Sequence, residues 1–464
     1  MTRWTPAVLM FAVCILTAGT ATAQHVGWRT DGTGKYPAAK PLTTWGPTTN
    51  VLWKTPMPSA SNATPVLVGD KLFVTAEPMK LICVDANTGE IIWEAENSFE
   101  DMATPEEAAQ MAAKNQEARD LRRERGGLWG KVRRLKTSVQ DDPENAELKK
   151  ELEEAQSRQK EIDGLLAEYD RLWYSMPDVH PINGNSSATP ASDGEHVWVS
   201  FATGLVACYD LDGNLVWRRM VEKPNITWGS CSSPVVVDDI VLIHIHHLFG
   251  LDKLTGETRY SPASEWNWGT PALMTLGDTV VAIDGSGTVI RVSDGKVMAQ
   301  KLFRLEYNGP VVEGDVVYFI QNGGKAFRLS LSEDGESVNA EKLWDTHPKK
   351  ERYYACPVVH DGLVYAINQV SVFSAIDAAT GEVVYEQNLE FGKGTIYPSV
   401  TMAGEYLYVS SDNGKTAVIK PGPTFDQVAM NELEPFRSCP VFVGDKCYIR
   451  GLSNLYCLAP IGEG

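Results

Sequence analysis

The sequence predicts an all-β protein: an eight-bladed β-propeller closed by its N-terminal strand, with an inserted α-helical coiled-coil hairpin. Two repeated features predict this fold. Prolines recur 37 to 47 residues apart after a longer first gap, each followed by an apolar run and a turn rich in Gly and Asp: Pro65, Pro190, Pro234, Pro271, Pro310, Pro357, Pro398 and Pro440. A second turn, such as Asn87-Thr88-Gly89, precedes an aromatic residue such as Trp93. Four short strands in a period of roughly 40 residues are typical of a propeller blade.

The first and last repeats predict how the ring closes. Residues 61–94, SNATPVLVGDKLFVTAEPMKLICVDANTGEIIWE, contain all four strands of a blade, joined by turns whose Gly and Asp residues suit tight hairpins. Residues 439–460, CPVFVGDKCYIRGLSNLYCLAP, contain three strands and lack the outer one. The segment NVLWKTP at residues 50–56 has the tryptophan of an outer strand. We expect it to complete the last blade, because closure hides exposed sheet edges.

The long first gap, residues 102–175, predicts a helical insertion. Glu, Lys, Arg, Gln and Ala are frequent there, and apolar positions in the second half alternate spacings of four and three, as in a coiled coil. The first half has a weaker pattern that Gly126-Gly127 breaks, and Pro143 marks a turn. The insertion is either a solvated decoration or an arm that docks a partner protein.

The N-terminus and the charge balance predict an exported protein. Residues 1–23 combine Arg3, an apolar stretch and a small-residue end, which is typical of a signal peptide cleaved before Gln24. The alternative is an uncleaved anchor. No later stretch reaches the roughly 20 apolar residues of a spanning helix, so we expect no transmembrane segment. A net charge of −18 argues against binding nucleic acid or anionic membrane surfaces. We therefore expect a periplasmic or extracellular protein; its oligomeric state stays open.

Seven cysteines remain after the predicted cleavage: 83, 208, 231, 356, 439, 447 and 457. None are adjacent and no C-x-x-C occurs, so the sequence does not predict a disulfide scaffold. One or two bridges remain an open alternative in an exported protein. Cys83, Cys208, Cys447 and Cys457 occupy strand positions typical of buried small hydrophobes.

The repeats VDANTGEIIWE and TPVLVGDKLFV, with the opening GWRTDGTGKYPAAKPLTTWGPTTNVLWKT, resemble the pyrroloquinoline quinone (PQQ)-like β-propeller superfamily of exported bacterial proteins. The resemblance covers nearly all of residues 27–460 except the helical insertion. It implies a propeller fold and leaves function open, since the superfamily includes quinone-dependent alcohol and sugar dehydrogenases, an outer-membrane assembly scaffold and many non-catalytic propellers. The dehydrogenases use PQQ with calcium and typically have adjacent cysteines beside the quinone, which this sequence lacks.

The segments before the repeated prolines are expected to converge on one mouth of the central channel. The predicted ligand- or partner-binding residues there are Asn62, Trp228, Trp268, Tyr307, Tyr353, Tyr354 and Arg437. Such a rim suits a planar or anionic ligand, or a peptide. The alternative is an aromatic rim that only fills volume. The sequence predicts no catalytic residue.

The stretch IHIHHLFGLDKLTGE, residues 243–257, places His244, His246 and His247 at the end of a strand and in the following hairpin. His244 and His246 are expected to share a strand face, and we include both among the binding residues. Protonation of the histidines would make such a contact depend on pH. A closed metal site needs three or four ligands, and the segment alone does not supply them. No metal site is therefore predicted.

These observations divide the chain into a signal peptide (1–23), an N-terminal segment with closing strand and first blade (24–101), the hairpin (102–175) and the remaining seven blades (176–464). They favour an exported, non-catalytic binding or scaffold protein that contacts a protein or small-molecule ligand at the mouth and hairpin. The alternative is a PQQ-dependent oxidoreductase of alcohols or sugars with an atypical site.

Overall fold

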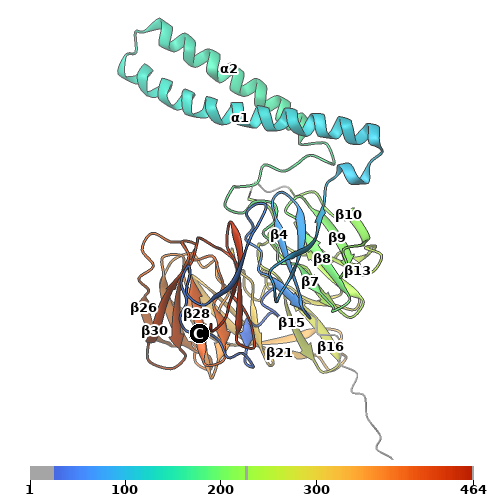
Figure 1. The fold of residues 1–464 in the computed structure, drawn as a ribbon, viewed down its shortest axis with the longest axis vertical. Coiled ribbons are helices and arrows are strands. Elements are labelled where there is room, and N and C mark those ends of the chain that lie inside the picture. Colours follow the sequence, from blue (N-terminus) through green and yellow to red (C-terminus); the bar gives the residue numbers. More distant parts are fainter. Residues whose placement is uncertain (1–25, 225–227, 462–464) are drawn as a thin grey trace, which may run out of the picture.

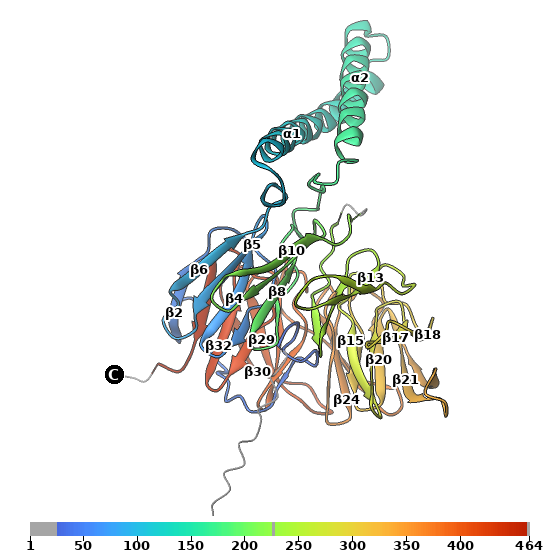
Figure 2. The same cartoon turned by 90° about the vertical axis from the view of Figure 1, so that its right-hand side faces the viewer.

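A computed structural model describes residues 26–224 and 228–461 (Figure 1). The predicted signal peptide and its cleavage point before Gln24 lie outside the described residues. Most of the regular structure is β, and two long helices stand apart from the strands (Figures 1 and 2). The predicted all-β class with an inserted helical pair is therefore confirmed.

The strands of the described residues form eight sheets of four antiparallel strands, one of which gains the short parallel strand β1 (Lys35–Tyr36). Seven sheets use four consecutive strands each: β3 (Val66–Val68), β4 (Lys71–Ala76), β5 (Lys80–Asp85), β6 (Ile91–Glu96); β7 (Ala191–Ser192), β8 (His196–Ser200), β9 (Leu205–Asp210), β10 (Leu215–Met220); β11 (Val235–Val237), β12 (Ile240–His244), β13 (Leu248–Asp252), β14 (Thr258–Tyr260); β15 (Ala272–Leu276), β16 (Thr279–Ile283), β17 (Val289–Arg291), β18 (Val297–Ala299); β19 (Val311–Glu313), β20 (Val316–Gln321), β21 (Gly323–Leu331), β22 (Val338–Thr346); β23 (Val358–His360), β24 (Leu363–Ile367), β25 (Val372–Asp377), β26 (Val383–Asn388); and β27 (Thr401–Ala403), β28 (Tyr406–Ser410), β29 (Lys415–Lys420), β30 (Asp426–Glu432).

The eighth sheet joins residues from both ends of the described chain. Strand β2 (Val51–Pro56) pairs antiparallel with the last strand of the group β31 (Val441–Val443), β32 (Lys446–Arg450) and β33 (Asn454–Leu458). The pairing aligns Trp53 with Cys457, so the N-terminal segment supplies the outer strand that the last repeat lacks.

Burial follows position within a sheet. Middle strands such as β4 and β5 are buried at nearly every residue, since neighbouring sheets cover both of their faces. Outer strands such as β6 leave most of their side chains partly or fully exposed. Face-to-face packing of many small antiparallel sheets is the architecture of a β-propeller.

The repeated tryptophans join one sheet to the next. Each indole Nε1 donates a hydrogen bond to a backbone carbonyl in the second turn of the following sheet: Trp53 to Ala86 (3.2 Å), Trp93 to Leu211 (3.1 Å), Trp217 to Lys253 (2.8 Å) and Trp344 to Ala378 (2.9 Å). A glycine in each turn, such as Gly89, leaves room for the ring. The turn glycine and the tryptophan, which recur in the sequence, therefore form a contact between neighbouring sheets.

The insertion forms an antiparallel pair, α1 (Pro105–Asp141) and α2 (Ala146–Tyr169), preceded by the 3-10 helix η1 (Glu100–Met102). Thr104 and Glu107 form a capping box at the start of α1, and Asn145 caps α2 after the predicted turn. Gly126 and Gly127 interrupt the apolar pattern but not the helix, since α1 continues through both glycines. Buried residues such as Val132, Ile162 and Leu166 form the seam between the helices.

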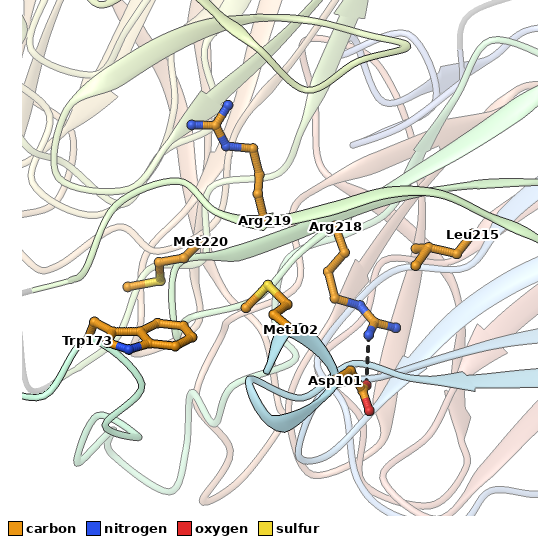
Figure 3. Close-up of a pocket in the computed structure, with 7 residues that line it drawn as sticks. All are labelled: Asp101, Met102, Trp173, Leu215, Arg218, Arg219 and Met220. Carbon is orange, nitrogen blue, oxygen red and sulfur yellow. Dashed lines mark hydrogen bonds and ion pairs between the residues drawn. The ribbon is translucent and has the colours of Figure 1, made fainter. Parts of the chain in front are cut away.

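A cleft marks the point where the hairpin meets strand β10 (Figure 3). Arg218 points to Asp101 and forms an ion pair of 2.7 Å with it, while its Nε donates to Asn97 Oδ1 at 3.0 Å. Trp173, from the segment after α2, lies near Met102 and Met220 in the same cleft. The ion pair and the hydrogen bond of Arg218 fix the base of the hairpin to the propeller.

The segment before β1 lines a cavity together with the turns that contain Gly69 and Gly444. Arg29 is 2% exposed, and its Nη2 donates to Pro357 O (2.7 Å) and Val400 O (3.0 Å), at the start of two innermost strands. The sequence offered no repeat or motif that predicts this contact.

All seven cysteines of the described residues are free, and all except Cys231 are buried. Burial raises the pKa of the Cys83 and Cys457 thiols to about 12. The predicted role of Cys83, Cys208, Cys447 and Cys457 as buried hydrophobes is confirmed. Among the helices of residues 26–224 and 228–461, none is long and apolar enough to cross a membrane.

Candidate functional site

Aromatic side chains from four successive sheets meet around one end of the propeller axis. Trp268 stacks on Tyr307 with ring centroids 5.6 Å apart. Tyr307 contacts Tyr354 at 5.1 Å, and Tyr354 stacks on Tyr397 at 5.2 Å. Each residue precedes the proline that begins an innermost strand, so the repeat itself places one ring per sheet at this rim. All four side chains are partly exposed. We call this rim the mouth.

The mouth continues through Arg437 and Asn62. The Arg437 guanidinium lies over the Tyr397 ring, 5.6 Å from its centroid. Its Nη1 also donates to Asn62 Oδ1 at 3.3 Å and to Ile182 O at 3.2 Å. Asn62 Nδ2 in turn donates to Ile182 O at 2.7 Å and to Asn183 O at 3.1 Å. The segment that returns from the hairpin is thereby held at the rim.

Trp228 completes the series of contacts around the mouth, which we call the circuit. Its ring is 47% exposed and stacks on His180 with centroids 3.9 Å apart. Asn183 Nδ2 donates to Trp228 O at 2.7 Å, and Trp268 Nε1 donates to Gly229 O at 3.2 Å. The structure therefore brings together six of the residues named from the sequence: Asn62, Trp228, Trp268, Tyr307, Tyr354 and Arg437.

Tyr353 lies in the core and not on the rim, contrary to its predicted position. It is 1% exposed, packs in the cluster that contains Trp344, and its hydroxyl donates to Lys349 O at 2.9 Å. Burial raises the pKa of this phenol. Neighbouring side chains in an extended segment point in opposite directions, so Tyr354 reaches the rim while Tyr353 turns inward.

His244 is also interior. It is 2% exposed, burial lowers its pKa to about 4, and neither ring nitrogen has a hydrogen-bond partner among the described residues. It therefore cannot make the surface contact predicted for it in this state.

His246 and His247 lie in the turn between β12 and β13. Glu222 accepts hydrogen bonds from both backbone amides, at 2.8 and 2.9 Å, and its other oxygen lies 2.5 Å from His247 Nδ1. The carboxylate thus holds the turn. The expectation that His246 shares a strand face with His244 fails, because β12 ends at His244.

Other mouth residues were not named from the sequence. Arg352 lies over Tyr307, 5.8 Å from its centroid, and its Nη1 is 3.4 Å from the Tyr354 hydroxyl. It lines a pocket of about 520 Å³ with Glu306, Tyr307, Gln321, Asn322, Lys350, Glu351 and Tyr353. Asp412 reaches within 4.0 Å of Arg437 Nε. Tyr397 could have been found from its place before Pro398, whereas Asp412 comes from another turn with no motif.

The chemistry of the mouth is that of recognition. Partly exposed aromatic faces and two guanidinium groups, Arg352 and Arg437, suit aromatic and carboxylate groups of a ligand. Calcium-bound PQQ would need several converging oxygen ligands. Within the part of the chain that the structure describes, no group of three or more His, Cys, Asp or Glu residues is placed to hold a metal. The residues present do not fit that cofactor.

A family model, PQQ_2, described as outer membrane protein assembly factor BamB, matches residues 42–126, 163–304 and 299–421. A curated protein of that name from Yersinia pestis is 23% identical over 232 residues, which cover 49% of this chain and 49% of the relative. The match spans about half the length of that relative. Residues 127–162, in the distal part of the hairpin, lie between the first two matched segments.

Solved structures show the same fold at low sequence identity. BamB from Moraxella catarrhalis is 9% identical, with 88% of this chain and 99% of that chain covered and a TM-score of 0.54. Quinohemoprotein alcohol dehydrogenase from Comamonas testosteroni is 10% identical, with coverage of 94% and 80% and a TM-score of 0.55. A europium-containing methanol dehydrogenase is 11% identical, with coverage of 92% and 90% and a TM-score of 0.55. These similarities concern the fold alone.

Proposed function

The chain belongs to the PQQ_2 family described as outer membrane protein assembly factor BamB, and from this premise we propose that it is an exported, non-catalytic protein that binds a partner at the mouth. The single observation that best supports this role is the circuit of aromatic and polar contacts from Trp228 to Arg437. The circuit gathers partly exposed recognition groups and contains no metal cluster within the described residues.

We propose that the propeller has eight blades and is closed by β2. The eight sheets of the described residues support the blade number. The pairing of β2 with β33, and the hydrogen bond from Trp53 to Ala86 in the next sheet, support closure by the N-terminal strand. The domain division at residues 23, 101 and 175 remains part of this proposal.

We propose that the protein acts in the periplasm or outside the cell, after cleavage before Gln24. The basic, apolar and small-residue sequence of residues 1–23 supports export. The names of the Yersinia pestis relative and the Moraxella catarrhalis structure contain outer membrane assembly or BamB, and they support a protein partner from envelope assembly. A small-molecule ligand at the mouth is the other occupant considered.

The mouth is suited to a protein partner because its groups resemble those that dominate protein interfaces. Tyr, Trp and Arg are enriched among residues that contribute most to binding free energy. Tyr307, Tyr354 and Tyr397 are held by ring contacts, and Arg437 by hydrogen bonds to Asn62 and Ile182. Little side-chain freedom is therefore lost when a partner binds.

The competing function, a PQQ-dependent oxidoreductase, has a direct test. The purified protein is incubated with PQQ and calcium, freed of unbound quinone, and assayed for retained quinone absorbance and for dye reduction with alcohols and sugars. We expect neither. Retained quinone together with substrate turnover would overturn the non-catalytic proposal.

The binding role is tested with mouth variants in the exporting host. A photo-crosslinking residue is placed at Trp228, the most exposed ring of the mouth, and its adducts are identified by mass spectrometry. We expect a defined protein adduct that the added substitution Tyr354→Ala reduces. The matched control places the crosslinker at Leu52 on the outer strand β2, where the side chain is 46% exposed and two strands separate it from β31, the innermost strand of its sheet. Equal adducts from both positions would contradict a mouth-specific partner.

A further inference from the structure

Positive charge is concentrated on one part of the hairpin. The chain has a net charge of −18, yet residues 125–140 contain five basic residues and no Asp or Glu. Four of the five, Lys131, Arg133, Arg134 and Lys136, are exposed and form no ion pair within the described residues. The fifth, Arg125, is paired with Asp178 and lies near Asp163. The free charges therefore all lie in the distal half of α1.

Two of these residues, Arg133 and Lys136, lie on the same side of α1 as an exposed tryptophan, Trp129. Val132 and Leu135 face α2, where they pack near Ala155. Because a helix turns by about 100° per residue, Trp129, Arg133 and Arg134 lie on the sides of α1 that α2 does not cover. The Trp129 ring is 64% exposed. We name Trp129, Arg133 and Lys136 the basic face of α1.

Glycines beside this face leave the helix backbone accessible. A Cβ atom at Gly126 or Gly127 would have no atom within 4 Å, so no contact of the folded chain requires glycine there. Gly130 would approach only the Arg134 side chain, at 3.6 Å. Glycine weakens a helix interior, and here it exposes a smooth surface next to Trp129. Such a surface allows another chain to approach closely.

The arrangement of the hairpin selects the kind of partner. In both views the hairpin stands over one end of the propeller, and Figure 1 shows α1 on the side of the hairpin nearer to the propeller (Figures 1 and 2). The segment that returns from the hairpin, at Ile182 and Asn183, is hydrogen-bonded into the mouth. The hairpin and the mouth are therefore on the same side of the propeller. A flexible protein segment can contact both surfaces at once.

We propose that the basic face of α1 and the mouth together bind an acidic segment of a partner protein. Carboxylates of the segment contact Arg133 and Lys136, and an aromatic or apolar side chain contacts the mouth rings near Tyr354. This inference rests on the proposed binding function and adds the charge of the partner. Opposite charge favours the encounter and discriminates against basic partners. A second copy of the chain is a poor occupant, because two copies with a net charge of −18 repel each other.

The test uses two synthetic peptides with a fluorescent label and the full-length mature protein. Both peptides have the same length and one central Trp; one is rich in Glu, and the other has Gln at the same positions. Fluorescence anisotropy is measured at low and physiological salt. We expect the Glu peptide to bind at least about tenfold more tightly than the Gln peptide, with the difference shrinking as salt screens the charges.

Matched variants locate the binding surface. Arg133→Glu/Lys136→Glu is expected to weaken binding of the Glu peptide by about tenfold or more. Lys149→Glu/Lys150→Glu changes the charge by the same amount on α2, and we expect less than about a twofold effect. Tyr354→Ala is expected to weaken binding as well, because the proposed site includes the mouth. Circular dichroism and thermal unfolding confirm that each variant folds.

Three outcomes would overturn the inference: equal affinity for the two peptides, equal effects of the α1 and α2 variants, or no effect of Tyr354→Ala. Anionic phospholipid vesicles form a further arm, and binding to them that depends on Arg133 and Lys136 as strongly as peptide binding does would assign the face to a membrane instead. The two proposals can fail separately. If the protein retains no quinone and forms a crosslinked adduct at the mouth, but binds the Glu and Gln peptides equally, the proposed function stands and this inference is wrong.

Discussion

Trp53 lies against Gly89, and this contact joins the N-terminal strand β2 to the turn of the sheet that follows it. A Cβ atom at Gly89 would lie 2.7 Å from the indole ring. The ring Nε1 donates to Ala86 O at 3.2 Å in the same turn, and Thr55 donates to Gly89 O at 2.6 Å. The same relationship recurs between Trp93 and Gly213, Trp217 and Gly256, and Trp344 and Gly381. At each of these sheet boundaries the tryptophan ring thus occupies the space that a side chain on the glycine would need.

Trp53→Ala is expected to destabilise the propeller by about 3 kcal/mol, the usual cost of removing a large aromatic side chain from a packed site. The loss combines the ring contact with Gly89 and the hydrogen bond to Ala86. Urea unfolding monitored by circular dichroism gives the change in unfolding free energy. Trp129→Ala is the control, because a ring that is 64% exposed should contribute less than about 0.5 kcal/mol. Equal losses in the two variants would contradict the intersheet role of Trp53.

Gly89→Ala and Gly69→Ala separate backbone strain from packing. Both glycines have positive φ, +77° and +60°, so alanine strains the backbone at each. At Gly89 the new methyl group also meets Trp53 and Thr55 at 2.7 Å, whereas at Gly69 nothing lies within 4 Å. We expect Gly89→Ala to lose about 1–3 kcal/mol more than Gly69→Ala in urea unfolding, the usual cost of overpacking. A difference near zero would show that the turn moves away at no cost.

Arg218→Ala is expected to loosen the base of the hairpin. Arg218 has a side chain that is 10% exposed and joins β10 to Asp101 of η1, with a hydrogen bond to Asn97. Without it, amide hydrogen exchange in η1 and the first turns of α1 should become about tenfold faster, because local opening costs less free energy. Arg219→Ala is the control, since Arg219 donates to Gly256 O of the next sheet at 2.5 Å and not to η1. Unchanged exchange in Arg218→Ala would assign the anchoring to the apolar contacts of Trp173 and Met102.

His244 makes stability depend on pH. Burial lowers its pKa from about 6.5 in the unfolded chain to about 4 in the folded chain, with the charged neighbours Glu222, His246 and His247 contributing less. The unfolded state therefore binds a proton first as pH falls. The contribution of neutral, buried His244 is complete above pH 6.5 and is lost between pH 6.5 and 4, by up to about 3 kcal/mol.

His244→Phe should flatten this part of the profile, since phenylalanine keeps a buried ring and does not titrate. Unfolding free energies measured at pH 7, 6, 5 and 4.5 give the slope for both proteins. The difference between the two curves should grow as pH falls, whatever the absolute stability of the variant. Parallel curves would show that His244 is protonated in the folded protein near its ordinary pKa.

The repeat pattern predicted the strands, the turns and most of the mouth, because each depends on nearby residues. The proline that begins an innermost strand fixed the place of Trp268, Tyr307 and Tyr354 one sheet at a time. It failed for Tyr353, because one step along an extended segment reverses the side chain. It failed for His244 because β12 is buried at every residue up to its last one, His244.

The sequence by itself determined the all-β class, the repeated sheets, the helical insertion and the apolar character of Cys83 and Cys457, since strand periodicity and turn chemistry are local properties. The tertiary structure alone decided that Arg29 reaches Pro357, that Asp412 approaches Arg437, and that the segment after the hairpin bonds to Asn62. These pairs are separated by 328, 25 and 120 residues along the chain. Their meeting follows from how the sheets are stacked around one axis, which no local pattern encodes.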